Sequence, residues 1–69
     1  MSTSKRLWSN VYAAAIRRGA NDHEIAEAMS VSERTLRTRK SDPGTATLKE
    51  IDRLCRWLGI TIRELARED

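Results

Sequence analysis

The chain has 69 residues with a net charge of +3, and 39% of its residues are hydrophobic and 33% are charged. This length predicts a single domain over residues 1–69, and the charge favours a polyanionic partner. No apolar run approaches the ~20 residues that span a bilayer, so we expect no membrane association and a cytoplasmic location.

The first two predicted helices are separated by a glycine. Apolar residues recur at helical spacing within Ser4–Arg18, and Gly19 follows as a left-handed C-terminal cap. Asn21 and Glu24 have the spacing of a capping box, in which each side chain accepts a hydrogen bond from the backbone N–H of the other residue. A short second helix is therefore predicted over Asp22–Met29.

The third predicted helix has one inward residue and a polar outer face. Ser32 supplies an N-cap oxygen, and Leu36 points inward. The outer face then contains Glu33, Arg34, Arg37, Thr38 and Ser41. The Asp42-Pro43-Gly44 sequence is typical of a turn and ends this helix near Ser41.

Two further helices are predicted after this turn. Thr47 and Glu50 form a second capping box ahead of the regular apolar stripe of Leu48–Leu58. Thr61 and Glu64 repeat the spacing before a short fifth helix. The sequence therefore predicts an all-α fold, a compact bundle of about five short helices without any β-strand.

The second and third predicted helices have the features of a helix-turn-helix. Such a pair needs a small residue where the helices approach, and Ala26 meets this need. It also needs apolar residues around the turn, which are Ile25, Met29, Val31 and Leu36. With this spacing the third helix turns its outer face away from the core.

The outer face of the third helix carries groups that can contact base edges in the major groove. Arg34 and Arg37 can donate two hydrogen bonds each to guanine O6 and N7. Glu33 can accept from cytosine N4, and Thr38 can contact a thymine methyl or a polar edge. Ser32 can contact a base or a phosphate, although capping alone also explains it. From Arg34 to Ser41 there are four basic residues and no acidic one.

From Asn21 to Ala66 the chain resembles the lambda-repressor/Cro-like helix-turn-helix family. The matching residues are Glu24-Ile25-Ala26, Val31-Ser32, Leu36, Pro43, Leu48 to Leu58, Gly59-Ile60-Thr61 and Leu65. The resemblance implies a small phage-type transcriptional regulator whose third helix lies in the major groove of double-stranded DNA. It also implies phosphate contacts at the start of the second helix and in the loop before the fourth.

The chain departs from the family pattern at three positions. Ser30 stands where relatives usually have glycine, so the turn must accept a left-handed serine or another shape. Asp22 stands where a glutamine commonly contacts phosphate, and Asn21 is the better candidate there. Arg39 replaces an apolar residue, so its stem can cover the core while its guanidinium reaches a phosphate. The candidate phosphate contacts are Asn21, Arg39, Lys40, Ser41, Thr45 and Thr47, of which Thr47 is equally explained by capping.

A candidate dimer contact lies on the fourth helix and after it. Trp57 falls about 110° from the centre of the apolar stripe, so it should be partly exposed. Together with Ile60 and Ile62 it can form a homodimer contact, or it can cover the edge of the core against the first helix. A twofold dimer would contact half-sites about one DNA turn apart.

Other function classes receive less support from the sequence. Cys55 and His23 are the only residues of their types, so no disulfide or His/Cys metal site is expected. No nucleophile with a base and no phosphate-binding glycine loop is present, so we expect no enzyme, no cofactor and no small-molecule substrate. The alternatives are an antitoxin or excisionase-like accessory DNA-binding protein, and an adaptor that binds another protein.

Overall fold

The helices begin and end at capping residues and glycines. The computed structural model describes residues 3–66, in which the elements follow in the order α1 (Thr3–Arg17), α2 (Asp22–Met29), α3 (Glu33–Ser41), η1 (Pro43–Thr45), α4 (Leu48–Leu58) and α5 (Ile62–Ala66). The described residues contain no strand, which confirms the predicted all-α bundle of five short helices. The predicted turn before α4 is the 3-10 turn η1.

Two of the three predicted capping boxes are complete, and at the third the Glu64 N–H donates to the Thr61 hydroxyl at 3.1 Å. The Asn21 side chain accepts from the Glu24 N–H at 2.9 Å, and the Glu24 carboxylate accepts from the Asn21 N–H at 3.0 Å. Thr47 and Glu50 make the same reciprocal pair at 3.1 Å each. At its other end α4 stops at Gly59, whose φ of +76° lies in the left-handed region that favours glycine. These local hydrogen bonds set the helix boundaries.

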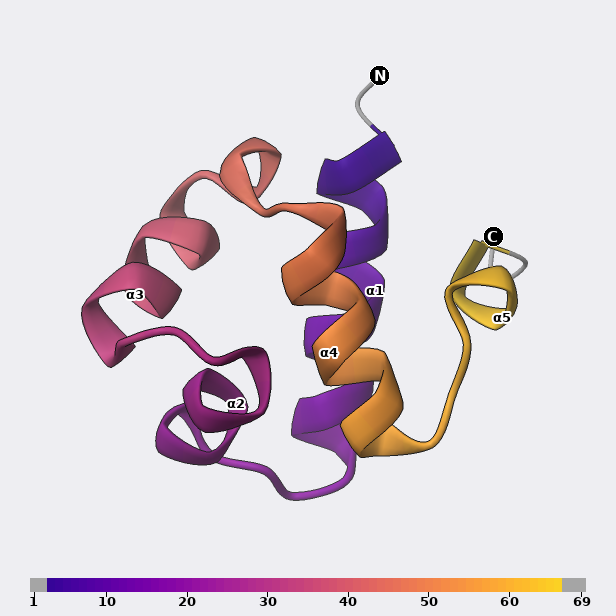
Figure 1. The fold of residues 1–69 in the computed structure, drawn as a ribbon, viewed down its shortest axis with the longest axis horizontal. Helices are drawn as coiled ribbons and strands as arrows, with labels where there is room; N and C mark the ends of the chain where they lie inside the picture. Colours follow the sequence, from indigo (N-terminus) through magenta and orange to yellow (C-terminus); the bar gives the residue numbers. More distant parts are fainter. Residues whose placement is uncertain (1–2, 67–69) are drawn as a thin grey trace.

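The core lies where α1 and α4 pack against each other and against the remaining helices. In Figure 1, α1 runs behind α4, with α2 and α3 on one side of this pair and α5 on the other. The fully buried side chains include Val11, Ala15, Ile25, Met29, Ile51 and Leu54. Burial of a large apolar side chain contributes about 1.5 to 3 kcal/mol, so this small cluster is the main source of stability.

The turn between α2 and α3 is tight. Ser30 has a φ of +60° and a ψ of 41°, so the left-handed serine is the conformation that the turn adopts. Its N–H donates to Glu27 O, and the Val31 N–H donates to Ala26 O, each at 3.0 Å. Ala26 is buried, as the predicted close approach of the two helices requires. This turn places α3 at the edge of the molecule, where α3 contacts α2 and η1.

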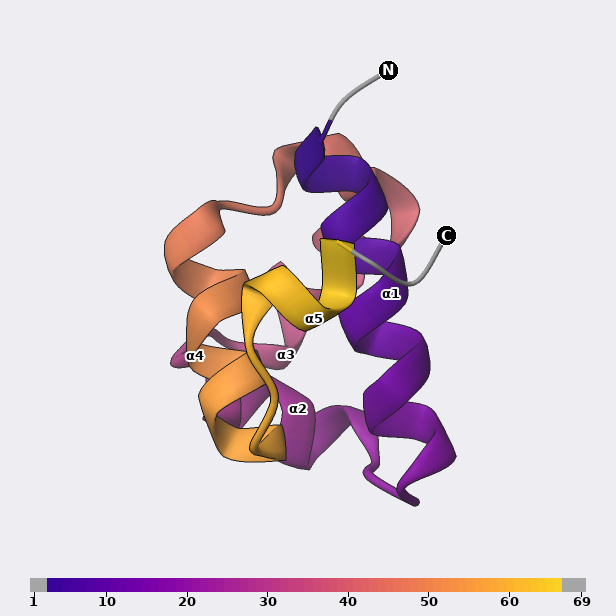
Figure 2. The ribbon, with the colours of Figure 1, turned by 90° about the vertical axis from the view of Figure 1, so that its right-hand side faces the viewer.

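The last helix packs on the side of the bundle away from α3. Figure 2 shows α5 lying across α1 and α4, and the Asn10 side chain donates to Leu65 O at 3.2 Å. Leu65 is 1% exposed and ties this short helix to the core. None of the helices formed by residues 3–66 has the length and apolar character that crossing a membrane requires.

Candidate nucleic-acid interface

The two faces of α3 differ in burial. Leu36 is the one buried residue of α3 and is 1% exposed, which anchors the helix to the bundle. Thr35 and Arg39 are half-buried on the same side. The residues predicted to form the outer face are all exposed: Glu33, Arg34, Arg37, Thr38 and Ser41. The structure therefore brings the predicted base-contacting side chains of α3 together on one solvent-facing surface.

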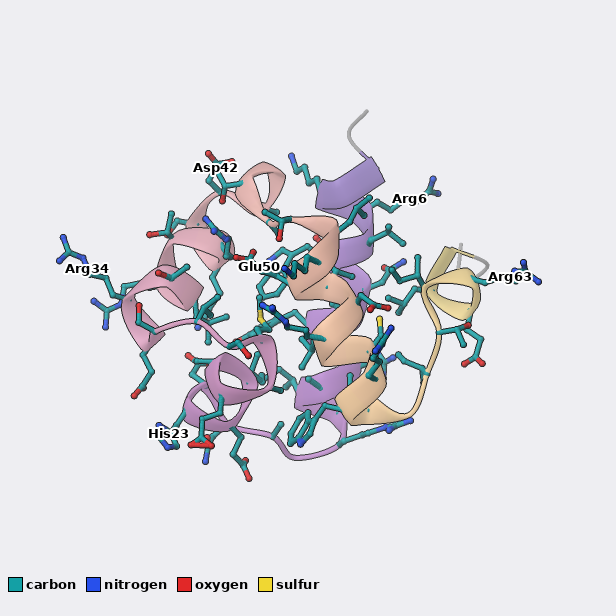
Figure 3. The ribbon with its side chains drawn as sticks, in the orientation of Figure 1. Arg6, His23, Arg34, Asp42, Glu50 and Arg63 are labelled. Atoms are coloured by element: carbon teal, nitrogen blue, oxygen red, sulfur yellow. The ribbon has the colours of Figure 1, made fainter. Side chains whose placement is uncertain are left out.

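Arg34 and Arg37 are the two cations of this outer face without a partner. Neither side chain makes a hydrogen bond or an ion pair with any residue in the described part of the chain. Figure 3 shows Arg34 extending away from the body of the protein. A guanidinium offers five N–H donors in a planar fork, and no residue in the described part of the chain accepts a hydrogen bond from these two guanidinium groups. This pair can bind an acceptor-rich, negatively charged ligand.

Two hydroxyl groups of this region are used within α3. The Ser32 hydroxyl accepts from the Thr35 N–H and donates to the Thr35 hydroxyl, both at 3.0 Å. Ser32 is thus an N-cap, and its own donor is already engaged. The Thr38 hydroxyl donates to Arg34 O at 3.3 Å, which leaves the hydroxyl able to act as an acceptor and leaves the methyl group for apolar contact.

Arg39, a candidate phosphate contact, pairs with a carboxylate of another helix. Its Nε and Nη2 donate to the two carboxylate oxygens of Glu50 at 2.9 and 3.0 Å, and the side chains are only 18% and 11% exposed. The hydrogen bonds from Arg39 hold the pKa of the Glu50 carboxyl below its usual value, against the opposing effect of burial. Figure 3 shows Glu50 between α3 and α4. Arg39 therefore joins two helices through an ion pair, which uses its Nε and Nη2 donors.

Lys40 belongs to a second group of interactions that joins three helices. Its ammonium lies 2.8 Å from Asp22 Oδ2 and 5.5 Å from the centre of the Tyr12 ring. The Tyr12 hydroxyl donates to the other oxygen of Asp22 at 2.9 Å. The hydrogen bonds from Lys40 and then Tyr12 lower the pKa of Asp22, so this carboxylate stays charged and paired. The negative charge at the start of α2 is thereby offset by Lys40, which remains partly exposed.

The other candidate phosphate contacts lie at helix ends. Asn21 and Thr47 are exposed N-caps, and their side-chain oxygens are used by the capping boxes. The Thr45 hydroxyl donates to Asp42 O at 2.7 Å within η1. Ser41, at the last position of α3, is exposed. Capping thus explains Asn21 and Thr47 without a ligand, because both their side-chain oxygens and their backbone N–H groups take part in the capping boxes.

His23 lies at the surface between two carboxylates. His23 Nε2 lies 2.9 Å from Glu27 Oε2, and Nδ1 lies 3.3 Å from Glu33 Oε2. The hydrogen bond to Glu33, followed by the charge of Glu27, raises the pKa of His23 above its usual value. The i, i+4 spacing of His23 and Glu27 was visible in the sequence, but the contact with Glu33 depends on the turn between α2 and α3.

The predicted exposure of Trp57 is confirmed. Its side chain is 49% exposed and, with Glu24, lines two adjoining surface hollows. Ile60 and Ile62, the other candidate dimer residues, are partly buried against the hydrophobic core. Trp57 is therefore the most accessible of the three candidate contacts.

No group of three or more His, Cys, Asp or Glu residues within residues 3–66 is arranged to hold a metal ion. Cys55 is buried on the core side of α4, and burial raises the pKa of its thiol to about 11. A thiol with this pKa is a poor nucleophile at neutral pH. Comparison of the chain with protein-family models, curated proteins and solved structures finds no significant match.

Proposed function

We propose that the protein binds double-stranded DNA in a sequence-specific manner, with α2 and α3 acting as a helix-turn-helix and α3 lying in the major groove. One observation carries this proposal: Arg34 and Arg37 are exposed and unpaired on one face of a helix whose opposite face is anchored by Leu36. The major groove is wide enough to admit a single α-helix such as α3. The biological role that follows is that of a small transcriptional regulator.

The chemistry of the outer face of α3 suits base contacts. Each free guanidinium can donate two hydrogen bonds to O6 and N7 of a guanine, which is the commonest specific contact in the major groove. The methyl group of Thr38 is available for a thymine methyl because its hydroxyl bonds to Arg34 O. We therefore expect a site in which guanines face Arg34 and Arg37.

The surroundings of α3 supply the contacts to the DNA backbone. Lys40 and Ser41 lie at the end of α3, Thr45 and Thr47 follow in the loop before α4, and Asn21 stands at the start of α2. The net charge of +3 favours approach to the phosphates. One such unit contacts too few base pairs for high specificity, so we expect a homodimer on DNA, with Trp57 as its candidate contact.

The test begins with selection of bound duplexes from a random library, followed by measurement of dissociation constants by fluorescence anisotropy. Arg34→Ala and Arg37→Ala should each weaken binding to the selected duplex by about 1 to 3 kcal/mol and relax the base preference at one position. Arg63→Ala is the matched control, because Arg63 is also exposed but lies on α5, on the far side of the bundle in Figure 3. Equal binding by all three variants would refute the assigned face.

Binding to another protein is the second candidate function, and the half exposure of Trp57 favours it. This function includes an antitoxin or accessory role in which the DNA-binding unit also holds a protein partner. Contacts to phosphates release counterions, so DNA binding must weaken steeply as salt rises. Binding that is insensitive to salt, together with no retention on duplex DNA, would favour an adaptor that binds protein alone.

A further inference from the structure

The start of the outer face of α3 is joined to α2 by one histidine. His23 is the second residue of α2, and its two ring nitrogens lie near Glu27 of the same helix and Glu33, the first residue of α3. All three side chains are well exposed, at 65%, 71% and 60%. These three side chains therefore lie on the surface that includes Glu33, the carboxylate predicted to contact a base.

This geometry favours a charged imidazole. Each ring nitrogen faces a carboxylate oxygen. An ionised carboxylate has no proton to donate, so it acts only as a hydrogen-bond acceptor. A neutral imidazole carries one N–H and can satisfy one carboxylate, whereas the imidazolium can donate to both. Loss of the proton removes the positive charge between the two carboxylates and so weakens both contacts. One of these is the contact to Glu33, which joins α2 to α3 at 3.3 Å.

Among residues 3–66, no other charged group of the neighbouring helices contacts the His23 ring. On α3, Lys40 pairs with Asp22 and does not contact His23. On α4, Arg53 donates to Met29 O, which is at the opposite end of α2 from His23. The charges that raise the pKa of His23 are those of Glu33 and Glu27 alone.

The geometry points to His23 as a positioning residue that controls Glu33 and makes DNA binding tighter when the imidazole carries a proton. The inference rests on the proposed function, since it concerns the same face of α3. The imidazolium holds the Glu33 carboxylate and offsets its repulsion of the DNA phosphates. Neutral His23 no longer offsets the charge of Glu33, which then repels phosphate more strongly and is freer to accept from cytosine N4. Raising the pH should thus lower affinity and increase preference for cytosine beside the start of α3.

The experiment measures the dissociation constant of the full chain for the selected duplex at about pH 6 and about pH 8, on either side of the range in which histidine titrates. The natural protein should bind about two- to five-fold more tightly at the lower pH, as one exposed ion pair can supply. His23→Gln and Glu33→Gln should each remove this pH dependence. Glu24→Gln is the control, because Glu24 is an exposed carboxylate of α2 that does not contact His23 and its replacement keeps the capping box.

A second readout does not involve DNA. The His23 ring, followed by NMR in the free protein, should titrate above its usual value of 6.5, and Glu33→Gln should lower that midpoint. A pH dependence that survives unchanged in His23→Gln would overturn this inference and leave the proposed function intact. Absence of duplex binding at both pH values would overturn the proposed function, and the inference with it.

Discussion

The four basic side chains of α3 fall into two pairs with opposite surroundings. Arg34 and Arg37 face solvent and have no partner among residues 3–66, whereas Arg39 and Lys40 lie against carboxylates of other helices. All four are charged, but only the first two present an unneutralised charge to a ligand. The basic segment thus has two parts: one pair of cations is open to solvent, and the other pair ties the helix that carries them to its neighbours.

Arg39 and Lys40 connect α3 to the rest of the bundle. Arg39 joins α3 to α4 through Glu50, and Lys40 joins α3 to α2 and α1 through Asp22 and Tyr12. A recognition surface needs rigid support, because small displacements of its side chains lose hydrogen bonds to a ligand. Leu36 alone is a narrow anchor for a helix of this size, and the two ion pairs complement it.

The largest expected effect is that of removing the acidic partner of Arg39. Glu50→Ala should destabilise the protein by about 3 kcal/mol, because it leaves a mostly buried guanidinium unpaired and also removes half of the α4 capping box. Urea denaturation followed by circular dichroism measures this change. The control is Glu24→Ala, which removes half of the exposed capping box of α2 but no ion pair. A loss no greater than that of the control would contradict the structural role of the Arg39–Glu50 pair.

A smaller effect is expected when Arg37 is replaced conservatively. Arg37→Lys keeps the charge but loses the planar pair of donors, so it should lose about 1 kcal/mol at the selected duplex and less at an unrelated duplex. Anisotropy titrations on the two duplexes give the comparison. If lysine served as well as arginine on the selected duplex, Arg37 would act as a phosphate contact and not as a base contact.

Lys40→Ala should have a smaller and less selective effect. The substitution removes one phosphate contact and uncovers Asp22, so all duplexes should be bound more weakly to a similar extent. The slope of log K against log salt should also fall in magnitude by about one. An effect confined to the selected duplex would show that Lys40 contacts a base, as proposed for Arg34 and Arg37.

The smallest effect on DNA binding is expected for the double variant Arg39→Leu/Glu50→Gln. Glutamine keeps the capping box and leucine fills the apolar position, so stability should change by less than about 1 kcal/mol at neutral pH. Affinity for DNA should be unchanged, because Arg39 is directed to Glu50. Weaker DNA binding by this variant would show that Arg39 contacts a phosphate.

The same double variant also tests whether the Arg39–Glu50 pair makes the stability of the protein depend on pH. Pairing lowers the folded-state pKa of Glu50 below its usual value of 4.5, so the pair stabilises the protein fully above that value. This stabilisation is lost as the pH falls below 4.5 and Glu50 becomes protonated. Acid titration of stability should therefore be steeper for the natural protein than for the double variant. Identical acid profiles would show that the ion pair contributes no stability.

Much of the fold could be predicted because it is encoded locally. The capping boxes at Asn21 and Thr47 place the starts of α2 and α4, and the burial of Leu36 follows from helical spacing. The exposure of Arg34 and Arg37 follows from the same spacing. Helix starts and side-chain burial could be predicted where they depend on the sequence of a single helix.

The pairing of the charges could not be predicted in this way. The Arg39–Glu50 and Lys40–Asp22 contacts join residues 11 and 18 positions apart, and each depends on how two helices pack. The contact between His23 and Glu33 likewise depends on the left-handed Ser30 in the turn. Which arginine is free and which is paired is thus a property of the tertiary structure.

The most direct test of the central claim is an NMR titration of the labelled protein with the selected duplex, in which every backbone amide is followed. We predict that the shift changes concentrate on Glu33–Ser41 and the loop before α4, while the amides of α5 change little. Changes centred on Trp57, or no changes in α3 upon binding, would contradict the account.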